Sequence, residues 1–207
     1  MTISQIKLDV SKIGTMKALS SPQVLHAIVE GCFTEKNRTL WRIDNLQGNI
    51  YLLLVSEQMP EFTNLAQQLC ASMASCQSKS YDKFLSSIKE GQTFRFRFTG
   101  NPVRNVATQK GERGKVIPIH KEEHKKEWLK ERSAKNGFAV EYDSIFITES
   151  RQQQFSQTSK RNQIRLSCTT FEGVLTVTNK EEFILALSKG IGRGKSYGSG
   201  LMTVMVI

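Results

Sequence analysis

The sequence predicts an α+β protein made of two consecutive units with the same order of elements. In residues 1–89, segments with alternating apolar residues and segments with apolar residues at helical spacing follow the order strand–helix–strand–strand–helix–strand. Residues 90–207 repeat this order more loosely, without a sequence repeat of fixed period. The order is that of the βαββαβ ferredoxin-like fold, which RRM-like domains share. We therefore expect an N-terminal ferredoxin-like domain over 1–89 and a C-terminal one over 90–207.

The first strand and the first helix have clear local signals. Apolar residues alternate in Ile3–Val10, which predicts a strand. Ser21 precedes Pro22, and serine is a favoured N-cap while proline suits the first position of a helix. The helix that follows has one apolar stripe at helical spacing, made of Val24, Leu25, Ile28, Val29, Cys32 and Phe33.

A hairpin, a second helix and a fourth strand complete the N-terminal unit. Thr39–Asn45 and Asn49–Ser56 are predicted strands around a Gln47–Gly48 turn. Pro60–Met73 is a predicted helix. Tyr81–Ile88 is expected to be the last strand of this unit.

The C-terminal unit begins with a strand over Gln92–Thr99. Arg95 and Arg97 face one side of it, and the other side carries Phe94, Phe96 and Phe98. We expect these phenylalanines to form core and not to stack on bases. A loop over Arg104–Lys115 follows, because this stretch has two glycines and no apolar periodicity. Lys121–Lys135 is then a charged helix.

The last third of the chain supplies the remaining elements. Glu141–Thr148 is a predicted strand, and the polar stretch Gln152–Gln163 is a predicted mobile turn. Ile164–Thr178 is a long strand or hairpin. Glu181–Lys189 is a short helix, and Leu201–Ile207 is expected to close the sheet as a buried strand.

The charge of the chain indicates a polyanionic partner. It has 29 Lys and Arg residues against 19 Asp and Glu, a formal net charge of +10 and a pI near 9.6. Most of the excess lies in residues 104–207, which hold 18 cations and 11 acids. Nucleic acid is the leading candidate, and a basic surface kept for solubility is the alternative. No apolar run approaches the roughly 18–20 residues that span a bilayer, so we expect no membrane partner.

From the first residues and the cysteines we expect a cytoplasmic protein. The first residues lack a basic segment followed by an apolar one, so no secretory signal is expected. The four cysteines form no CxxC pair, which argues against a disulfide scaffold and against a tetrahedral zinc site. We expect no metal and no small-molecule cofactor.

Residues 190–200 contain five glycines in eleven positions. Such a segment can approach a ligand closely and point N–H groups at phosphate oxygens. It is neither a Walker A loop nor a dinucleotide fingerprint, because Lys189 and Lys195 stand where those motifs need glycine. A flexible loop tip is the alternative to contact with a phosphodiester backbone. The predicted phosphate contacts are Gly190, Gly192, Arg193, Gly194, Lys195 and Ser196.

His26 is the candidate for acid–base chemistry. It lies on the border between the apolar and polar faces of its predicted helix, so packing can anchor the ring while its tip reaches a ligand. A neutral histidine accepts and returns a proton near pH 7. An edge histidine without chemistry is the alternative. His120 and His124 lie four residues apart on a charged helix, without an evident third ligand, so no metal site is predicted.

Several motifs spread over the chain resemble one family. They are Leu25–His26, Gln58–Met59–Pro60, Asn101–Pro102–Val103–Arg104, Phe171–Glu172–Gly173–Val174–Leu175, and Gly190–Ile191–Gly192 with Lys195–Ser196, Gly198 and Gly200–Leu201. Together they resemble the CRISPR-associated endoribonucleases of the RAMP superfamily, specifically the subunit that processes precursor CRISPR RNA in type I-E Cascade. The resemblance extends over essentially all 207 residues.

The resemblance implies tandem ferredoxin-like domains and a metal-independent ribonuclease. Such an enzyme cuts CRISPR repeat RNA at the 3′ base of its stem-loop and leaves a 5′-hydroxyl and a 2′,3′-cyclic phosphate, because the 2′-hydroxyl attacks the adjacent phosphate. His26 coincides with the family's catalytic histidine. The enzyme keeps its product, so the expected partners are the repeat stem-loop, the mature CRISPR RNA (crRNA) and other Cascade subunits.

The chain departs from the family pattern at two positions. Some members carry tyrosine three residues before this histidine and lysine five residues after it, where this chain has Gln23 and Gly31. Lys36 and Arg38 lie near in sequence and could replace them. Because these partners differ, a catalytically inactive RNA-binding subunit of the same effector complex is the alternative function. A basic domain for another polyanion is a third reading.

The resemblance also implies where RNA binds. The family inserts a basic β-hairpin of the second domain into the groove of the RNA stem, and here that region holds Arg151, Lys160, Arg161 and Arg165. The deep, narrow major groove of A-form RNA is hard to read base by base, so recognition should depend mainly on phosphates and shape. Arg104 and Lys115 are further candidates.

Overall fold

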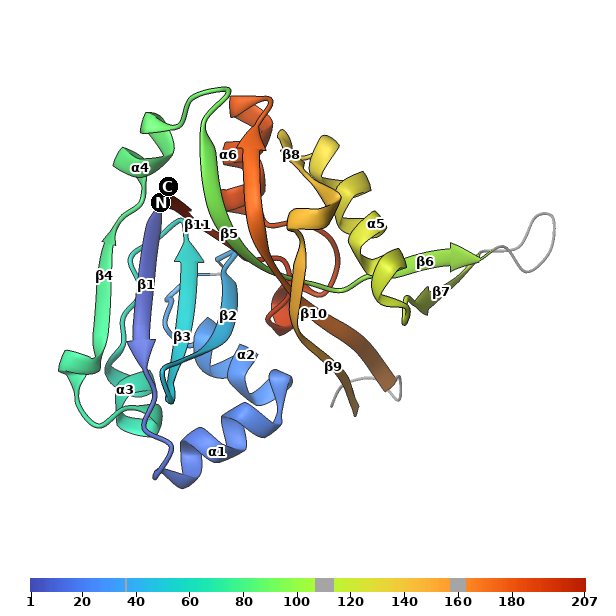
Figure 1. The fold of residues 1–207 in the computed structure, drawn as a ribbon. Coiled ribbons are helices and arrows are strands. Elements are labelled where there is room, and N and C mark those ends of the chain that lie inside the picture. The colour runs from blue at the N-terminus through green and yellow to red at the C-terminus, as the bar shows by residue number, and fades with distance from the viewer. Residues whose placement is uncertain (36, 107–113, 157–162) are drawn as a thin grey trace.

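The structure is a computed structural model that describes residues 1–35, 37–106, 114–156 and 163–207 (Figure 1). Two antiparallel sheets, one from each half of the chain, form its frame, and a separate two-stranded hairpin projects from the second half (Figure 1). Each sheet has four main strands. Numbered by their order along their own half of the chain, these strands lie side by side in the order second–third–first–fourth in both sheets. The predicted α+β fold with tandem ferredoxin-like units is therefore confirmed.

The first sheet has the strand order β2–β3–β1–β4. Its strands are β1 (Thr2–Lys7), β2 (Leu40–Leu46), β3 (Asn49–Ser56) and β4 (Cys76–Ser80), and its helices are α1 (Ile13–Ser20), α2 (Pro22–Glu30) and α3 (Thr63–Leu69). Leu25 and Val29 of α2 and Leu65 and Leu69 of α3 are buried in one cluster with Ile6 of β1. The apolar stripe of α2 thus faces the sheet, as its spacing predicts.

Local signals place the start of α2 and the first hairpin correctly. The Ser21 hydroxyl accepts a hydrogen bond from the backbone N–H of Val24 at 3.4 Å, and Pro22 occupies the first helical position. Gln47 and Gly48 have φ values of 52° and 79°, the left-handed pair that a two-residue hairpin turn requires. β2 and β3 therefore pair in register around this turn.

The prediction of a strand over Tyr81–Ile88 is wrong. Residues 82–87 form helix α4 (Asp82–Ser87), because Tyr81, Leu85 and Ile88 recur at helical spacing and are all buried. The fourth strand is the preceding β4, whose residues are mostly polar and pair on one side only, with β1. The helix expected over Pro60–Met73 is confined to α3, followed by the 3-10 turn η1 (Met73–Ser75), and α1 was not predicted.

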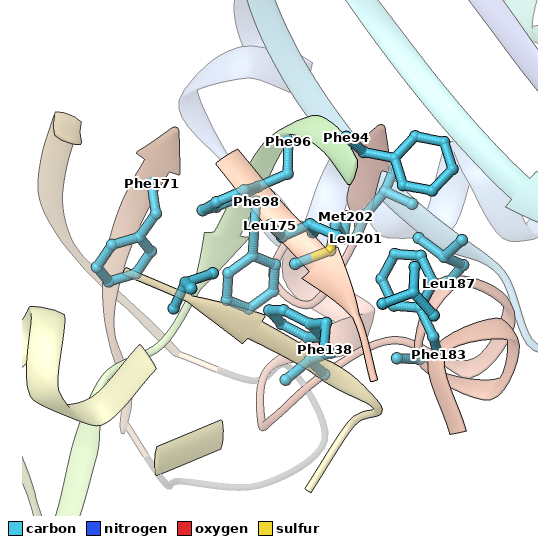
Figure 2. Packing of buried hydrophobic residues seen from close by; sticks show 14 of the residues in the cluster. Phe94, Phe96, Phe98, Phe138, Phe171, Leu175, Phe183, Leu187, Leu201 and Met202 are labelled. Atoms are coloured by element: carbon cyan, nitrogen blue, oxygen red, sulfur yellow. The ribbon is translucent and has the colours of Figure 1, made fainter. Parts of the chain in front are cut away.

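The second sheet has the order β11–β5–β10–β8, and β9 pairs with β10 outside this path. Its strands are β5 (Thr93–Gly100), β8 (Phe138–Val140), β9 (Phe146–Ser156), β10 (Gln163–Val177) and β11 (Met202–Val206), and its helices are α5 (Glu122–Ala134) and α6 (Lys180–Lys189). The predicted alternation of β5 is confirmed, since Phe94, Phe96 and Phe98 are buried. Figure 2 shows these rings packed with Phe138, Phe171 and Phe183.

Four predictions in this half need correction. Residues 103–106 and 115–118 form a hairpin of β6 (Val103–Val106) and β7 (Lys115–Pro118) where a loop over Arg104–Lys115 was predicted. The strand expected over Glu141–Thr148 begins only at Phe146, after the 3-10 turn η2 (Tyr142–Ser144). The turn predicted over Gln152–Gln163 is wrong at both ends, because residues 152–156 belong to β9 and Gln163 begins β10. Residues 157–162 of this predicted turn lie outside the described residues. β11 is an edge strand, and Met205 and Val206 are 61% and 58% exposed because nothing pairs beyond it in the described sheet.

Arg42 joins the two sheets. It lies on β2 with 1% of its surface exposed, and it donates five hydrogen bonds. Two go to the Asp44 carboxylate at 2.8 Å each, and the others go to the second unit, namely to the carbonyls of Arg97 and Leu201 and to the Thr203 hydroxyl. Asp44 also accepts from Arg97 Nε at 3.1 Å. The buried charge pair fixes the two units relative to each other.

Candidate active site

His26 lies where α2 meets the glycine-rich segment 190–200. Its side chain is 25% exposed, and Nε2 lies 3.3 Å from the Glu30 carboxylate one helical turn later. The Tyr197 ring packs edge-on against the imidazole, with 5.6 Å between ring centroids. Tyr197 in turn packs edge-on against Phe155 of β9 at 4.8 Å. The imidazole is thus anchored on two sides while part of it reaches solvent, as its position on the helix predicts.

A pocket of about 400 Å³ opens beside His26. The first unit lines it with His26, Val29, Glu30, Asn37, Arg38 and Thr39, and the second unit lines it with Lys195 and Ser196. The structure therefore brings together three of the predicted site residues, His26, Lys195 and Ser196, from opposite ends of the chain. Arg38 is present as well, whereas Lys36 lies outside the described residues.

Apart from the Glu30 carboxylate, which lies beside His26, the polar groups of this pocket suit an anion. Burial and the nearby Arg38 charge both lower the pKa of Lys195, whose ammonium donates to the carbonyl of Lys189 at 2.7 Å. Asn37 Nδ2 and Thr39 Oγ1 are buried side-chain atoms without a hydrogen-bond partner among the described residues. Buried polar groups are usually paired, so these two are available to a bound ligand. Neither residue was predicted as a site residue, because nothing in the sequence near Asn37 and Thr39 indicates that distant segments pack there to form a pocket.

The glycine-rich segment is packed against both units. Trp41 Nε1 donates to the carbonyl of Ser196 at 3.2 Å, and a side chain at Gly198, whose φ is 80°, would lie 2.6 Å from the Trp41 ring. On the other side, Ser199 Oγ lies 3.3 Å from Cys168 Sγ of β10. These contacts hold Lys195 and Tyr197 in place and do not fit a free loop tip. The segment also contains the 3-10 turn η3 (Lys195–Tyr197).

The other predicted positions of this segment lie outside the pocket. A Cβ at Gly190 would lie 2.7 Å from a methyl carbon of Leu40, so that glycine permits close packing between the units. A Cβ at Gly194 would lie 3.2 Å from Leu166. Arg193 is exposed and, with its neighbour Gly192, faces the region of Trp128 instead of His26.

The basic residues lie on two hairpins. Arg151 of β9 is half-buried and forms a 3.4 Å ion pair with Glu149, while Arg165 of β10 is exposed. Lys160 and Arg161 lie outside the described residues. Arg104 of β6 and Lys115 of β7 are exposed on the separate hairpin. Phe155, which touches Tyr197, connects the β9–β10 hairpin to the His26 pocket.

Three further observations bear on metals and membranes. In the part of the chain that the structure describes, no group of three or more His, Cys, Asp or Glu side chains could hold a metal ion. His120 Nδ1 lies 3.3 Å from Gln152 Nε2. Among the described residues, no helix is long and apolar enough to cross a membrane.

The fold and the site define a tandem ferredoxin-like protein with a histidine pocket at the contact between its two units. The chain belongs to the CRISPR associated protein family, whose sequence pattern matches residues 1–205. The family resemblance predicted from the sequence is therefore confirmed.

Two relatives and two solved structures show the extent of the similarity. The chain is 24% identical over 221 residues to the CRISPR-associated endoribonuclease Cse3 of Thermus thermophilus, covering 99% of both chains. It is 28% identical over 167 residues to the CRISPR system Cascade subunit CasE of Escherichia coli, covering 77% of this chain and 76% of that one. Cse3 bound to a 19-nucleotide RNA superposes with a TM-score of 0.84 at 21% identity, covering 99% of this chain and 100% of that one. Cas6e of Escherichia coli superposes with a TM-score of 0.71 at 23% identity, covering 100% of both.

Proposed function

We propose that this protein is a metal-independent endoribonuclease that cleaves CRISPR precursor RNA at the base of the repeat stem-loop. It leaves a 5′-hydroxyl and a 2′,3′-cyclic phosphate, and it stays bound to the mature crRNA as a subunit of Cascade. The observation that carries the proposal is the pocket that places His26 beside Arg38, Lys195 and Ser196. The names of the relatives, an endoribonuclease and a Cascade subunit, support it.

The reaction needs only groups that this pocket and the substrate hold. The 2′-hydroxyl of the RNA attacks the adjacent phosphorus, a new O2′–P bond forms, and the P–O5′ bond breaks. One proton leaves the 2′-oxygen and one is delivered to the 5′-oxygen, so the nucleophile comes from the substrate and no water is consumed. His26 is the catalytic residue that exchanges one of these protons. Holding the 2′-oxygen, phosphorus and 5′-oxygen in line supplies much of the rate.

Arg38 and Lys195 take the place of the tyrosine and lysine that some relatives carry at positions 23 and 31. Both side chains line the same pocket as His26, and we assign them to the negative charge that develops on the phosphoryl oxygens. Because its pKa is lowered, Lys195 also gives up a proton more readily than an ordinary lysine. The Asn37 amide and the Thr39 hydroxyl, which lack partners among the described residues, hydrogen-bond and orient the phosphate.

The β9–β10 hairpin holds the RNA stem through phosphate contacts. Arg151 and Arg165 supply charge on its described part, and Lys160 and Arg161 belong to the same proposal from the sequence alone. Arg104 and Lys115 are further RNA-binding residues, on the separate β6–β7 hairpin and outside this stem-binding surface. The backbone around Gly190, Gly192, Arg193 and Gly194 contacts the strand near the cut. These contacts do not read base edges, which agrees with recognition of a stem by shape and charge.

Two remaining parts of the proposal concern organisation and location. The chain divides into functional domains at 1–89, which carries His26, and 90–207, which carries the basic hairpins and the glycine-rich segment. We place the protein in the cytoplasm, where CRISPR transcripts are processed. The alternative, a catalytically inactive RNA-binding subunit, has the same fold and basic hairpins and lacks only the chemistry of His26.

Single-turnover cleavage of a repeat stem-loop in EDTA tests the proposal. Wild type is compared with His26→Ala and, as a control at an exposed position of α4, with Lys83→Ala. A substrate with 2′-deoxyribose on the 5′ side of the cut tests the nucleophile. We expect cleavage by wild type and Lys83→Ala only, with the deoxy substrate intact and His26→Ala binding normally. Binding without cleavage by wild type would establish the inactive subunit instead.

A further inference from the structure

A second groove lies next to the glycine-rich segment, between the β6–β7 hairpin and α5. Its volume is about 710 Å³, within the range of binding sites for small molecules and larger than a single phosphate group needs. Arg193 lines this groove, whereas Lys195, two residues later, lines the His26 pocket. The glycine-rich segment therefore borders both sites. Figure 1 shows the hairpin projecting beside α5.

The groove carries unneutralised positive charge. Four cations line it, Arg104, Lys121, Arg132 and Arg193, against the two acids Glu127 and Glu131. None of the four forms an ion pair with a carboxylate within the described residues. The Arg132 guanidinium lies over the Trp128 ring, 5.6 Å from its centroid. An anionic ligand is the complement of this charge.

Trp128 provides a buried donor at the same place. The residue lines the groove, is 5% exposed, and its Nε1–H has no acceptor among the residues that the structure describes. Its ring is fixed by stacking on Phe98 and Phe171, with centroids 6.4 Å and 6.3 Å away. An indole N–H normally finds a partner when it is buried. An oxygen of a phosphate or a base would be such a partner.

The distance between the two sites suits consecutive nucleotides of one strand. Arg193 and Lys195 are two residues apart, and two residues of chain span at most about 7 Å. A strand with its cleaved phosphate near Lys195 can therefore continue past Arg193 into the groove. Since the proposed cut lies at the 3′ base of the stem, the nucleotides on its 5′ side are paired in the stem. The nucleotides on its 3′ side are single-stranded.

We propose that this groove binds the single-stranded RNA on the 3′ side of the cleaved bond. The inference rests on the proposed function for the position of the cut. Arg104 and Arg193 contact phosphates, and the Trp128 N–H donates to an oxygen of the same segment. The groove thus aligns the leaving strand, which adds to the in-line geometry at the phosphorus.

Binding measurements by fluorescence anisotropy test the groove. The RNAs are a stem-loop that ends at the cut, the same stem-loop with a short 3′ extension, and the same with a short 5′ extension, each with 2′-deoxyribose at the cut. Trp128→Phe removes the indole N–H and keeps a ring, Arg104→Gln removes a charge without touching the core, and Lys83→Gln is the surface control. We expect both groove variants to bind the 3′-extended RNA roughly threefold to tenfold more weakly, with the other two RNAs and Lys83→Gln unchanged.

Equal weakening on all three RNAs would overturn the inference, because the groove would then hold the stem. Weakening on the 5′ extension alone, or on none of the RNAs, would overturn it too.

A short single-stranded oligouridylate, used alone, separates this inference from the proposed function. Binding that is weakened by Arg104→Gln and Trp128→Phe supports the groove even if no stem-loop is cut. If wild type cleaves the stem-loop but all variants bind oligouridylate with equal affinity, the inference about the groove is wrong and the proposed function still holds.

Discussion

Tyr197 packs edge-on against His26, with 5.6 Å between the ring centroids and 64° between the ring planes. The two residues come from opposite halves of the chain, α2 and η3. Tyr197 also contacts Phe155 on the hairpin that carries Arg151 and Arg165. One ring therefore sets the position of the proposed catalytic histidine relative to the proposed stem-binding hairpin.

Replacing Tyr197 should separate positioning from chemistry. Tyr197→Phe keeps the ring contact, so we expect cleavage close to wild type. Tyr197→Ala removes it, and a misplaced histidine should lower the single-turnover rate by roughly tenfold to hundredfold. Stem-loop affinity, measured in parallel, should change much less than the rate. A loss of the same size in both variants would show that the hydroxyl, and not the ring contact, matters.

Lys195 should set the alkaline limit of the reaction. Burial and the nearby Arg38 charge lower its pKa below the ordinary range of lysine, so the charged form is lost at a lower pH than for an exposed lysine. In the proposed role the ammonium stabilises the negative charge on the phosphoryl oxygens, so the rate falls as pH rises through this lowered pKa. Lys195→Arg keeps its charge at higher pH, so its rate should not fall there, and Lys195→Met should be slow at every pH. Single-turnover rates measured across the alkaline range check this, and profiles of the same shape in wild type and Lys195→Arg would contradict it.

Arg165 should act through phosphate charge. It is exposed on β10, so Arg165→Gln should leave stability unchanged. Removing one phosphate contact should weaken stem-loop binding and reduce the slope of log affinity against log salt by about one. Titrations at several salt concentrations measure the slope. A variant with wild-type slope would place Arg165 away from the RNA.

Arg42 should be a determinant of stability. The side chains of Arg42 and Asp44 are 2% and 3% exposed, so Arg42→Met leaves a buried carboxylate without its main partner. We expect a loss of about 3–5 kcal/mol in the free energy of unfolding, measured in urea. The control is Lys189→Met, which breaks the exposed ion pair with Glu57 and should have a much smaller effect. Similar losses in both variants would contradict the role of burial.

The sequence predicted the elements whose local signals agree with their tertiary setting. Ser21 and Gly48 mark a cap and a turn that form as expected, and the phenylalanine alternation identifies β5. Polar edge strands were missed, because β4 and the β6–β7 hairpin have no buried face to create a pattern. Asn37 and Thr39 were missed for a related reason, since only the packing of distant segments makes them part of a pocket.

The joint at Arg42 has a consequence for how long the protein keeps its RNA. Three of its five hydrogen bonds connect β2 to the second unit, at Arg97 of β5, at Leu201 and at Thr203 of β11, so the two walls of the His26 pocket cannot separate without exposing a buried charge. Enzymes that turn over quickly often open to release product. A protein whose two units are held together in this way lacks such an opening motion for release of the product RNA. This agrees with the proposed function as a single-use role, in which each molecule cuts one transcript and then stays bound to the RNA it has cut.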